Sequence, residues 1–98
     1  MLRFRNESID RLFKTVLNLK TIEECYDYFA DICTIKEVQD MAQRLDTAIL
    51  LDKGMSYQKI AELANVSTST IGRVNKCLTY GSGGYRNAID RLNQTEEK

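Results

Sequence analysis

Apolar residues recur every three or four positions through most of the chain, which is the spacing of one buried face of an α-helix. No stretch shows the strict alternation of a half-buried strand, and the 98 residues include no proline. A chain without proline favours uninterrupted helices. The sequence therefore predicts a single all-α domain, residues 1–98, of about six helices. Their expected ranges are about 7–18, 22–33, 35–53, 57–64, 68–78 and 85–93.

Helix-capping residues support three of these boundaries. Thr21 followed by Glu24, and Thr34 followed by Glu37, each predict a capping box at a helix start. Gly54 predicts the end of the longest helix. We expect the helix after Thr21 to bury one apolar face, made of Ile22, Cys25, Tyr26, Phe29 and Ile32.

The stretch from about 56 to 78 has the pattern of a helix-turn-helix. Ser56 and Ser67 are good N-caps for two successive helices, and Asn65 can adopt the left-handed conformation that ends the first. Ile60, Val66, Ile71 and Val74 are expected to fill the wedge between these helices, and Ala61 is small where the helices nearly touch. Ala64 extends the apolar face of the first helix, and Leu78 extends the buried stripe of the second. Two alternatives stay open, namely an ordinary pair of packed helices and a helix-turn-helix used for protein contact.

Polar residues remain on the outer side of the second helix, and their charge is one-sided. They are Ser67, Thr68, Ser69, Thr70, Gly72, Arg73, Asn75 and Lys76. The formal net charge of the chain is zero, yet residues 53–86 carry five Lys or Arg and only one acid, Glu62. A helix with hydroxyls and cations suits the negatively charged major groove, so double-stranded DNA is the predicted partner.

Composition argues against several other classes of protein. Three cysteines without a C-x-x-C pair, and the lack of histidine, disfavour a disulfide framework and a zinc site, so no metal or cofactor is expected. No nucleophile-with-base arrangement or phosphate loop indicates an enzyme. The longest apolar block is four residues, too short to span a membrane. Free thiols are typical of the cytoplasm.

The apolar content also bears on assembly. It is 43%, which is generous for so short a chain. Short amphipathic helices are unstable alone in water, and three of them with one long helix would leave apolar surface uncovered. The sequence therefore predicts a homodimer that interleaves these helices.

Four blocks give the chain a family resemblance. They are LNLKTIEECYDYF, DICTIKEVQDMAQRL, TSTIGRVNKCL and the run from Tyr80 to Tyr85. The sequence resembles the Trp repressor superfamily, and more closely its YerC/YecD-type branch. The resemblance implies a Trp-repressor-like, intertwined homodimer that regulates bacterial transcription, as a repressor that binds a near-palindromic operator. It also places the DNA contacts at Gln58, Thr68, Ser69, Thr70, Gly72 and Lys76; the polar face adds Ser67 and Arg73.

The resemblance also implies where an effector would bind, and the sequence departs from the family there. In the Trp repressor two arginines sandwich the indole, and a glycine follows the second. Arg73 matches the second arginine, but Gln43 stands at the first and Val74 replaces the glycine. The implied pocket comprises Gln43, Arg44, Arg73, Val74 and Cys77. We therefore expect regulation independent of tryptophan, with any small-molecule effector unknown.

Several residues keep two or more interpretations. Arg73 could contact a base edge, a phosphate or an acid of the long helix. Cys77 could be a redox switch or simply packed, and the run Gly81–Gly84 an anion-binding nest or a hinge. The acidic residues of the second helix could form a metal or partner site or a solvated face: Glu23, Glu24, Asp27 and Asp31. A small protein–protein interaction module remains the alternative function.

Overall fold

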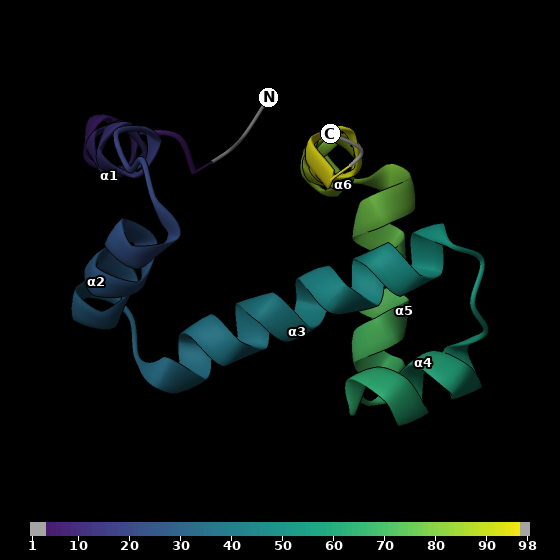
Figure 1. Ribbon diagram of the computed structural model, residues 1–98. Coiled ribbons are helices and arrows are strands. Elements are labelled where there is room, and N and C mark those ends of the chain that lie inside the picture. Colours follow the sequence, from purple (N-terminus) through teal and green to yellow (C-terminus); the bar gives the residue numbers. More distant parts are fainter. Residues whose placement is uncertain (1–3, 97–98) are drawn as a thin grey trace. The chain divides into compact units, whose positions relative to one another are not determined.

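A computed structural model describes residues 4–96, and this range contains six helices and no strand (Figure 1). The helices are α1 (Glu7–Leu17), α2 (Ile22–Ile32), α3 (Ile35–Asp52), α4 (Tyr57–Ala64), α5 (Thr68–Tyr80) and α6 (Gly84–Glu96). The all-α prediction is confirmed. The chain divides into two compact units, residues 1–38 and 39–98, with the boundary inside α3. The assignment of all 98 residues to one domain stays a prediction.

The helix starts in the first unit follow the capping pattern, with one difference. At α3, the Glu37 N–H donates to Thr34 Oγ1 at 3.1 Å, and the Thr34 N–H donates to Glu37 Oε1 at 2.8 Å. At α2, Thr21 Oγ1 accepts from the Glu24 N–H as predicted. The Glu24 carboxylate, however, accepts from the N–H of Lys20 at 2.7 Å, one residue further back than expected. It still satisfies a donor that precedes the helix.

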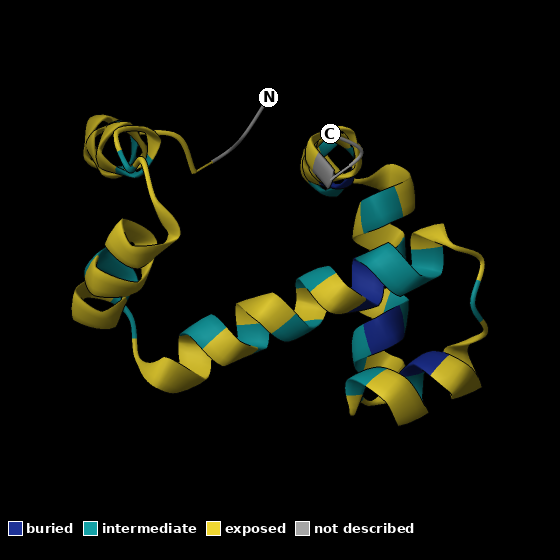
Figure 2. Cartoon of the chain, viewed as in Figure 1, coloured by how far each residue is buried: buried dark blue, intermediate teal, exposed yellow. Residues whose placement is uncertain are grey.

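The hydrophobic core lies in the second unit. Ala48 of α3, Val74 of α5 and Ile89 of α6 are buried together, and half-buried apolar residues pack around them: Ile49, Leu51, Leu78 and Tyr85. Ile60 of α4 and Ile71 of α5 are also fully buried. Figure 2 shows buried positions on α3, α4 and α5, so the two helices of the motif share this core with the C-terminal half of α3.

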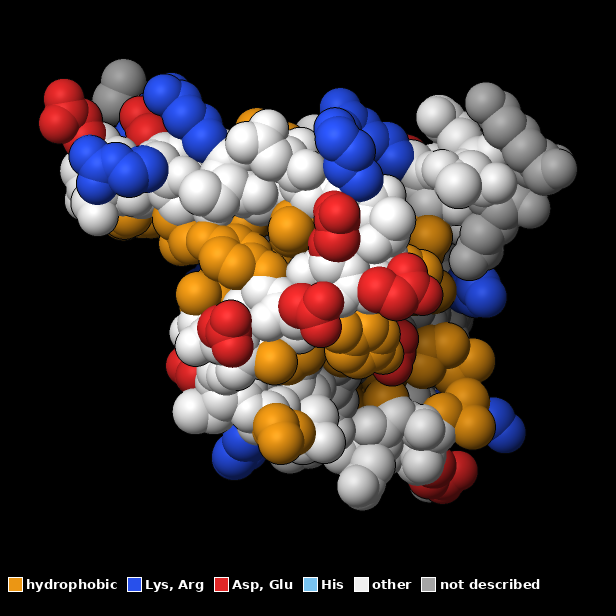
Figure 3. All heavy atoms as spheres, turned by 60° about the vertical axis from the view of Figure 1, so that its left-hand side comes forward, with side chains coloured by type: hydrophobic (Ala, Val, Ile, Leu, Met, Phe, Trp, Pro, Cys, Tyr) orange, Lys and Arg blue, Asp and Glu red, His pale blue; other side chains and the backbone are white. Residues whose placement is uncertain are grey.

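The first unit has no buried residue among its described positions, 4–38. Ile22 and Tyr26 of α2 are 71% and 73% exposed, and Leu17 of α1 is 81% exposed. The predicted burial of the α2 face is therefore wrong for a single chain. The periodicity is that of an amphipathic helix, but within residues 4–38 only Phe29 of this apolar face is half-buried and the rest of the face is exposed. Apolar side chains also gather on the face drawn in Figure 3.

The C-terminal boundaries differ slightly from the prediction. α5 runs to Tyr80 and α6 from Gly84 to Glu96, so the joint between them shortens to residues 81–83. Gly81 is required there, because a Cβ at this position would lie 2.2 Å from the Cys77 carbonyl oxygen. Residues 94–96, beyond the predicted end of the last helix, are also helical, while 97–98 and the start of the chain, 1–3, lie outside the described residues.

Candidate nucleic-acid interface

The helix-turn-helix forms with the predicted caps. Ser56 Oγ accepts from the Lys59 N–H at 3.2 Å and begins α4, while Ser67 Oγ accepts from the Thr70 N–H at 3.1 Å and begins α5. Asn65 ends α4 with φ 56° and ψ 48°, the left-handed conformation. The two predicted helices and their caps are confirmed, with α5 two residues longer than expected.

One side of α5 is fixed by packing, which leaves the opposite side to solvent. Ile71 and Val74 are buried. Thr68, Ser69, Arg73 and Lys76 are exposed at i, i+1, i+5 and i+8 spacing, and Gly72, at i+4, lies between them on the same side. We call these five residues the outer face of α5. Gln58 is exposed on α4, and Asn75 is half-buried.

The hydroxyls at the start of α5 differ in availability. Ser67 Oγ lies 3.0 Å from Thr70 Oγ1 and donates to it, so these two hydroxyls are already paired in the cap. Thr68 and Ser69 make no side-chain hydrogen bond within residues 4–96. Among the predicted contact residues, Thr68 and Ser69 thus offer unpaired hydroxyls, whereas Ser67 and Thr70 mainly shape the helix start.

Arg73 forms no ion pair within the described part of the chain, so the pairing with an acid of α3 is not observed. Gly72 has equally few neighbours: a Cβ placed there would meet no heavy atom within 4 Å. Glycine in a helix interior costs about 0.5–1 kcal/mol relative to alanine. Packing among residues 4–96 therefore does not require a glycine at position 72.

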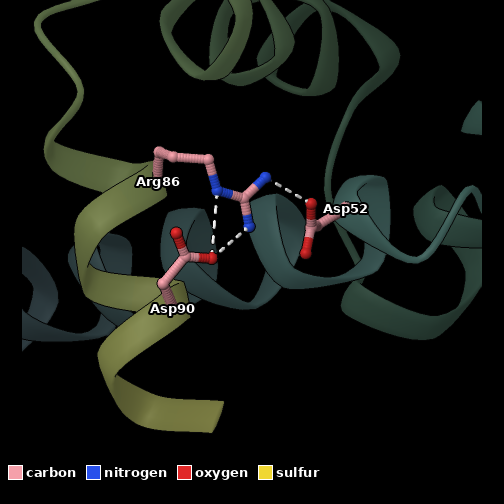
Figure 4. A network of polar contacts seen from close by, with 3 residues as sticks. All are labelled: Asp52, Arg86 and Asp90. Carbon is pink, nitrogen blue, oxygen red and sulfur yellow. Dashed lines mark hydrogen bonds and ion pairs between the residues drawn. The ribbon is translucent and has the colours of Figure 1, made fainter. Parts of the chain in front are cut away.

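Arg86 belongs to a different network from the cations of α5 (Figure 4). Its guanidinium, on α6, lies 2.6 Å from Asp52 Oδ1 at the end of α3 and 3.0 Å from Asp90 Oδ1. The hydrogen bond from Arg86 holds the pKa of Asp52 below its usual range, and the two carboxylates raise the pKa of Arg86. The basic segment 53–86 therefore offers four cations that are not held in this network: Lys53, Lys59, Arg73 and Lys76.

The five residues of the implied effector pocket line one cleft. Gln43, Arg44, Arg73, Val74 and Cys77 surround a volume of about 430 Å³, together with Asp40, Thr70 and Tyr85. Cys77 is exposed, so in a single chain it is not a packed core residue. Gln43 has a contact that the sequence did not reveal: its Nε2 donates to the carbonyl oxygens of Ala64 at 3.1 Å and Asn65 at 2.9 Å.

The acidic residues of α2 line a separate cleft in the first unit. Glu24, Asp27 and Asp31 surround about 400 Å³ with Thr15, Leu19 and Tyr28. The described residues contain no group of three or more His, Cys, Asp or Glu placed to hold a metal ion. No helix within residues 4–96 has the length and hydropathy needed to cross a bilayer.

Six helices with a helix-turn-helix packed on the longest one define an all-α helix-turn-helix protein. The Trp repressor protein family matches residues 7–93 of the chain. The chain belongs to the Trp repressor family, as its sequence predicted, and like the non-enzymatic regulators of that family it is not an enzyme.

Individual relatives agree with this assignment. The chain is 47% identical over 94 residues to the uncharacterized protein YerC of Bacillus subtilis (strain 168), covering 96% of this chain and 90% of YerC. A TrpR-like protein from Eubacterium eligens superimposes with a TM-score of 0.89 at 40% identity, over 93% of this chain and 94% of that one. A candidate Trp repressor from Staphylococcus aureus gives a TM-score of 0.89 at 38% identity, over 93% and 91% of the two chains. The Trp-repressor-like fold is thus established.

Proposed function

We propose that this chain is a sequence-specific DNA-binding regulator of transcription that places α5 in the major groove. The observation that carries the proposal is the outer face of α5. Its Thr68 and Ser69 hydroxyls are unpaired, Arg73 has no ion-pair partner within residues 4–96, and no acid lies between residues 63 and 89. Most protein–DNA hydrogen bonds go to phosphate and sugar, and the N-terminus of a helix adds partial positive charge.

The second part of the proposal is that the regulator is an intertwined homodimer. A stable monomer rarely exposes large contiguous apolar surface. Here α1 and α2 have no buried residue within residues 4–38, and their exposed apolar side chains include Phe13, Leu17, Ile22 and Tyr26. A second copy of the chain would cover these faces. Two helix-turn-helix motifs related by a two-fold axis would then require a near-palindromic operator.

The third part concerns regulation. We propose repression without tryptophan as co-repressor. Val74 is 2% exposed in the core and presents a branched side chain where the family has glycine. Both N–H groups of the Gln43 amide are directed to backbone carbonyls, so the cleft loses a donor for a ligand carboxylate. Calorimetric titration with L-tryptophan should give no saturable heat at micromolar concentration; a micromolar Kd would refute this part.

Salt dependence separates DNA binding from the alternative, a protein–protein interaction module. A protein that neutralises phosphates releases counterions, so the logarithm of its affinity falls by about 0.9 per contact with log salt. We expect a steep slope for duplex DNA measured by fluorescence anisotropy. Lys76→Ala should reduce it by about 0.9 per protomer, whereas Arg91→Ala, an exposed cation of α6, should leave it unchanged.

Absence of measurable affinity for duplex DNA at low salt would exclude the proposed function. It would favour the interaction module.

A further inference from the structure

Gln43 joins α3 to the turn of the helix-turn-helix through two directed hydrogen bonds. Its amide Nε2 donates to Ala64 O at 3.1 Å and to Asn65 O at 2.9 Å. A side-chain amide carries two N–H donors, so both are used by these carbonyls. The two acceptors are more than twenty residues from Gln43 in sequence, and the side chain is half-buried.

The two carbonyls that accept these hydrogen bonds lie at the C-terminal end of α4. The last carbonyls of an α-helix have no partner within the helix, and they need one from elsewhere. Ala64 is the last residue of α4, and Asn65 is its left-handed cap, two residues before Ser67 starts α5. Gln43 therefore connects α3 to the turn between α4 and α5.

Apolar packing alone would not fix this point. α3 and α5 meet in the core through apolar side chains that include Ala48 and Val74, and hydrophobic contacts are non-directional. Hydrogen bonds depend steeply on distance and angle. The pair of bonds from Gln43 thus restricts how the start of α5, with Thr68 and Ser69, is placed relative to α4 and Gln58.

We propose that Gln43 is a positioning residue that holds the helix-turn-helix in its DNA-binding geometry without any small molecule. The inference rests on the proposed function, because its benefit is DNA affinity. It assigns to a side chain of the protein itself the task of ordering the turn before DNA arrives. An ordered turn reduces the entropy lost on binding, so the preorganised protein binds more tightly.

Two variants remove the donors while retaining the size of the side chain. Gln43→Leu has no hydrogen-bonding group, and Gln43→Glu presents acceptors to two acceptors when it is ionised. We expect faster amide hydrogen exchange at residues 65–71 in both, with exchange around Ile89 in α6 unchanged. DNA affinity should fall about tenfold, which corresponds to about 1.4 kcal/mol.

Gln39→Leu is the matched control, because Gln39 is exposed one turn earlier on α3 and makes no side-chain hydrogen bond within residues 4–96. Unchanged exchange at 65–71 in the Gln43 variants would overturn the proposal. Equally faster exchange throughout residues 39–96 would also overturn it, because Gln43 would then act on global stability alone.

Exchange and DNA affinity are separate readouts. Wild-type protein that fails to bind DNA refutes the proposed function, and the DNA-positioning role of Gln43 with it, whereas the exchange data still decide whether the amide orders the turn. Local loosening with unchanged DNA affinity would refute the positioning role only.

Discussion

Gly72 gives the sharpest test of which surface meets DNA, because one substitution should change stability and binding in opposite directions. A Cβ at Gly72 meets no heavy atom within 4 Å, so Gly72→Ala introduces no clash within the chain. Replacing glycine by alanine in a helix interior stabilises by about 0.5–1 kcal/mol. For a domain of this size that raises Tm by about 2–8 °C.

The effect on DNA affinity should be unfavourable. Gly72 lies on the outer face of α5 between Thr68 and Lys76, so in the proposed complex the new methyl group would stand between α5 and the DNA. Overfilling a close-packed contact costs about 1–3 kcal/mol, which is about 5- to 150-fold in affinity.

Thermal melting and DNA titration of the same preparation provide the assay, at matched protein concentration. Gly84→Ala is the control for adding a methyl group away from the outer face of α5. Gly84 is the first residue of α6, and a Cβ there would also meet no heavy atom within 4 Å. A more stable Gly72→Ala protein that binds DNA as well as wild type would refute the assignment of this face. A lower Tm would refute the helix argument itself.

Three further predictions concern other parts of the molecule. If Arg73 contacts base edges, Arg73→Ala costs about 1–3 kcal/mol and relaxes one operator position; if it contacts phosphate, all sequences weaken alike and the salt slope falls by about 1 per protomer. Unchanged binding would remove Arg73 from the interface. For an obligate dimer, Tm rises with protein concentration. Leu17→Glu should then abolish folding, although Leu17 is 81% exposed in one chain; a well-folded monomeric Leu17→Glu protein would contradict the dimer. Because the pKa of Asp52 is lowered by Arg86, its contribution to stability is present above the unfolded-state pKa of about 3.9 and is lost as pH falls through the lower folded-state pKa. Between about pH 5 and 2, the Tm of Asp52→Asn should therefore fall less than the Tm of wild type or of the control Asp46→Asn. An equal fall of Tm in all three proteins would refute the contribution of the Asp52–Arg86 ion pair.

The sequence predicted the features that depend on neighbouring residues. Ser56, Ser67, Asn65 and Gly54 act on backbone groups within a few positions, and each is found at the expected helix end. The Asn6 cap of α1 was missed although its signal was present: Asn6 Oδ1 accepts from the Ile9 N–H at 2.9 Å.

Interactions between distant residues were harder to predict. Nothing local marks Gln43 as the partner of Ala64 and Asn65, because the contact exists only once α3 and α4 have packed together. The salt bridge between Arg86 and Asp52 spans 34 residues, and it pairs one of the five cations of the basic segment 53–86. For α2, periodicity identified the apolar face but could not say whether the same chain covers it.

The central claim is that two copies of α5 read a two-fold symmetric DNA site, and selection of bound sequences from random duplex DNA tests it most directly. We expect enrichment of a near-palindrome whose half-sites lie about 34 Å apart, one helical turn centre to centre. Failure to enrich any sequence, or enrichment of a single isolated half-site, would contradict it.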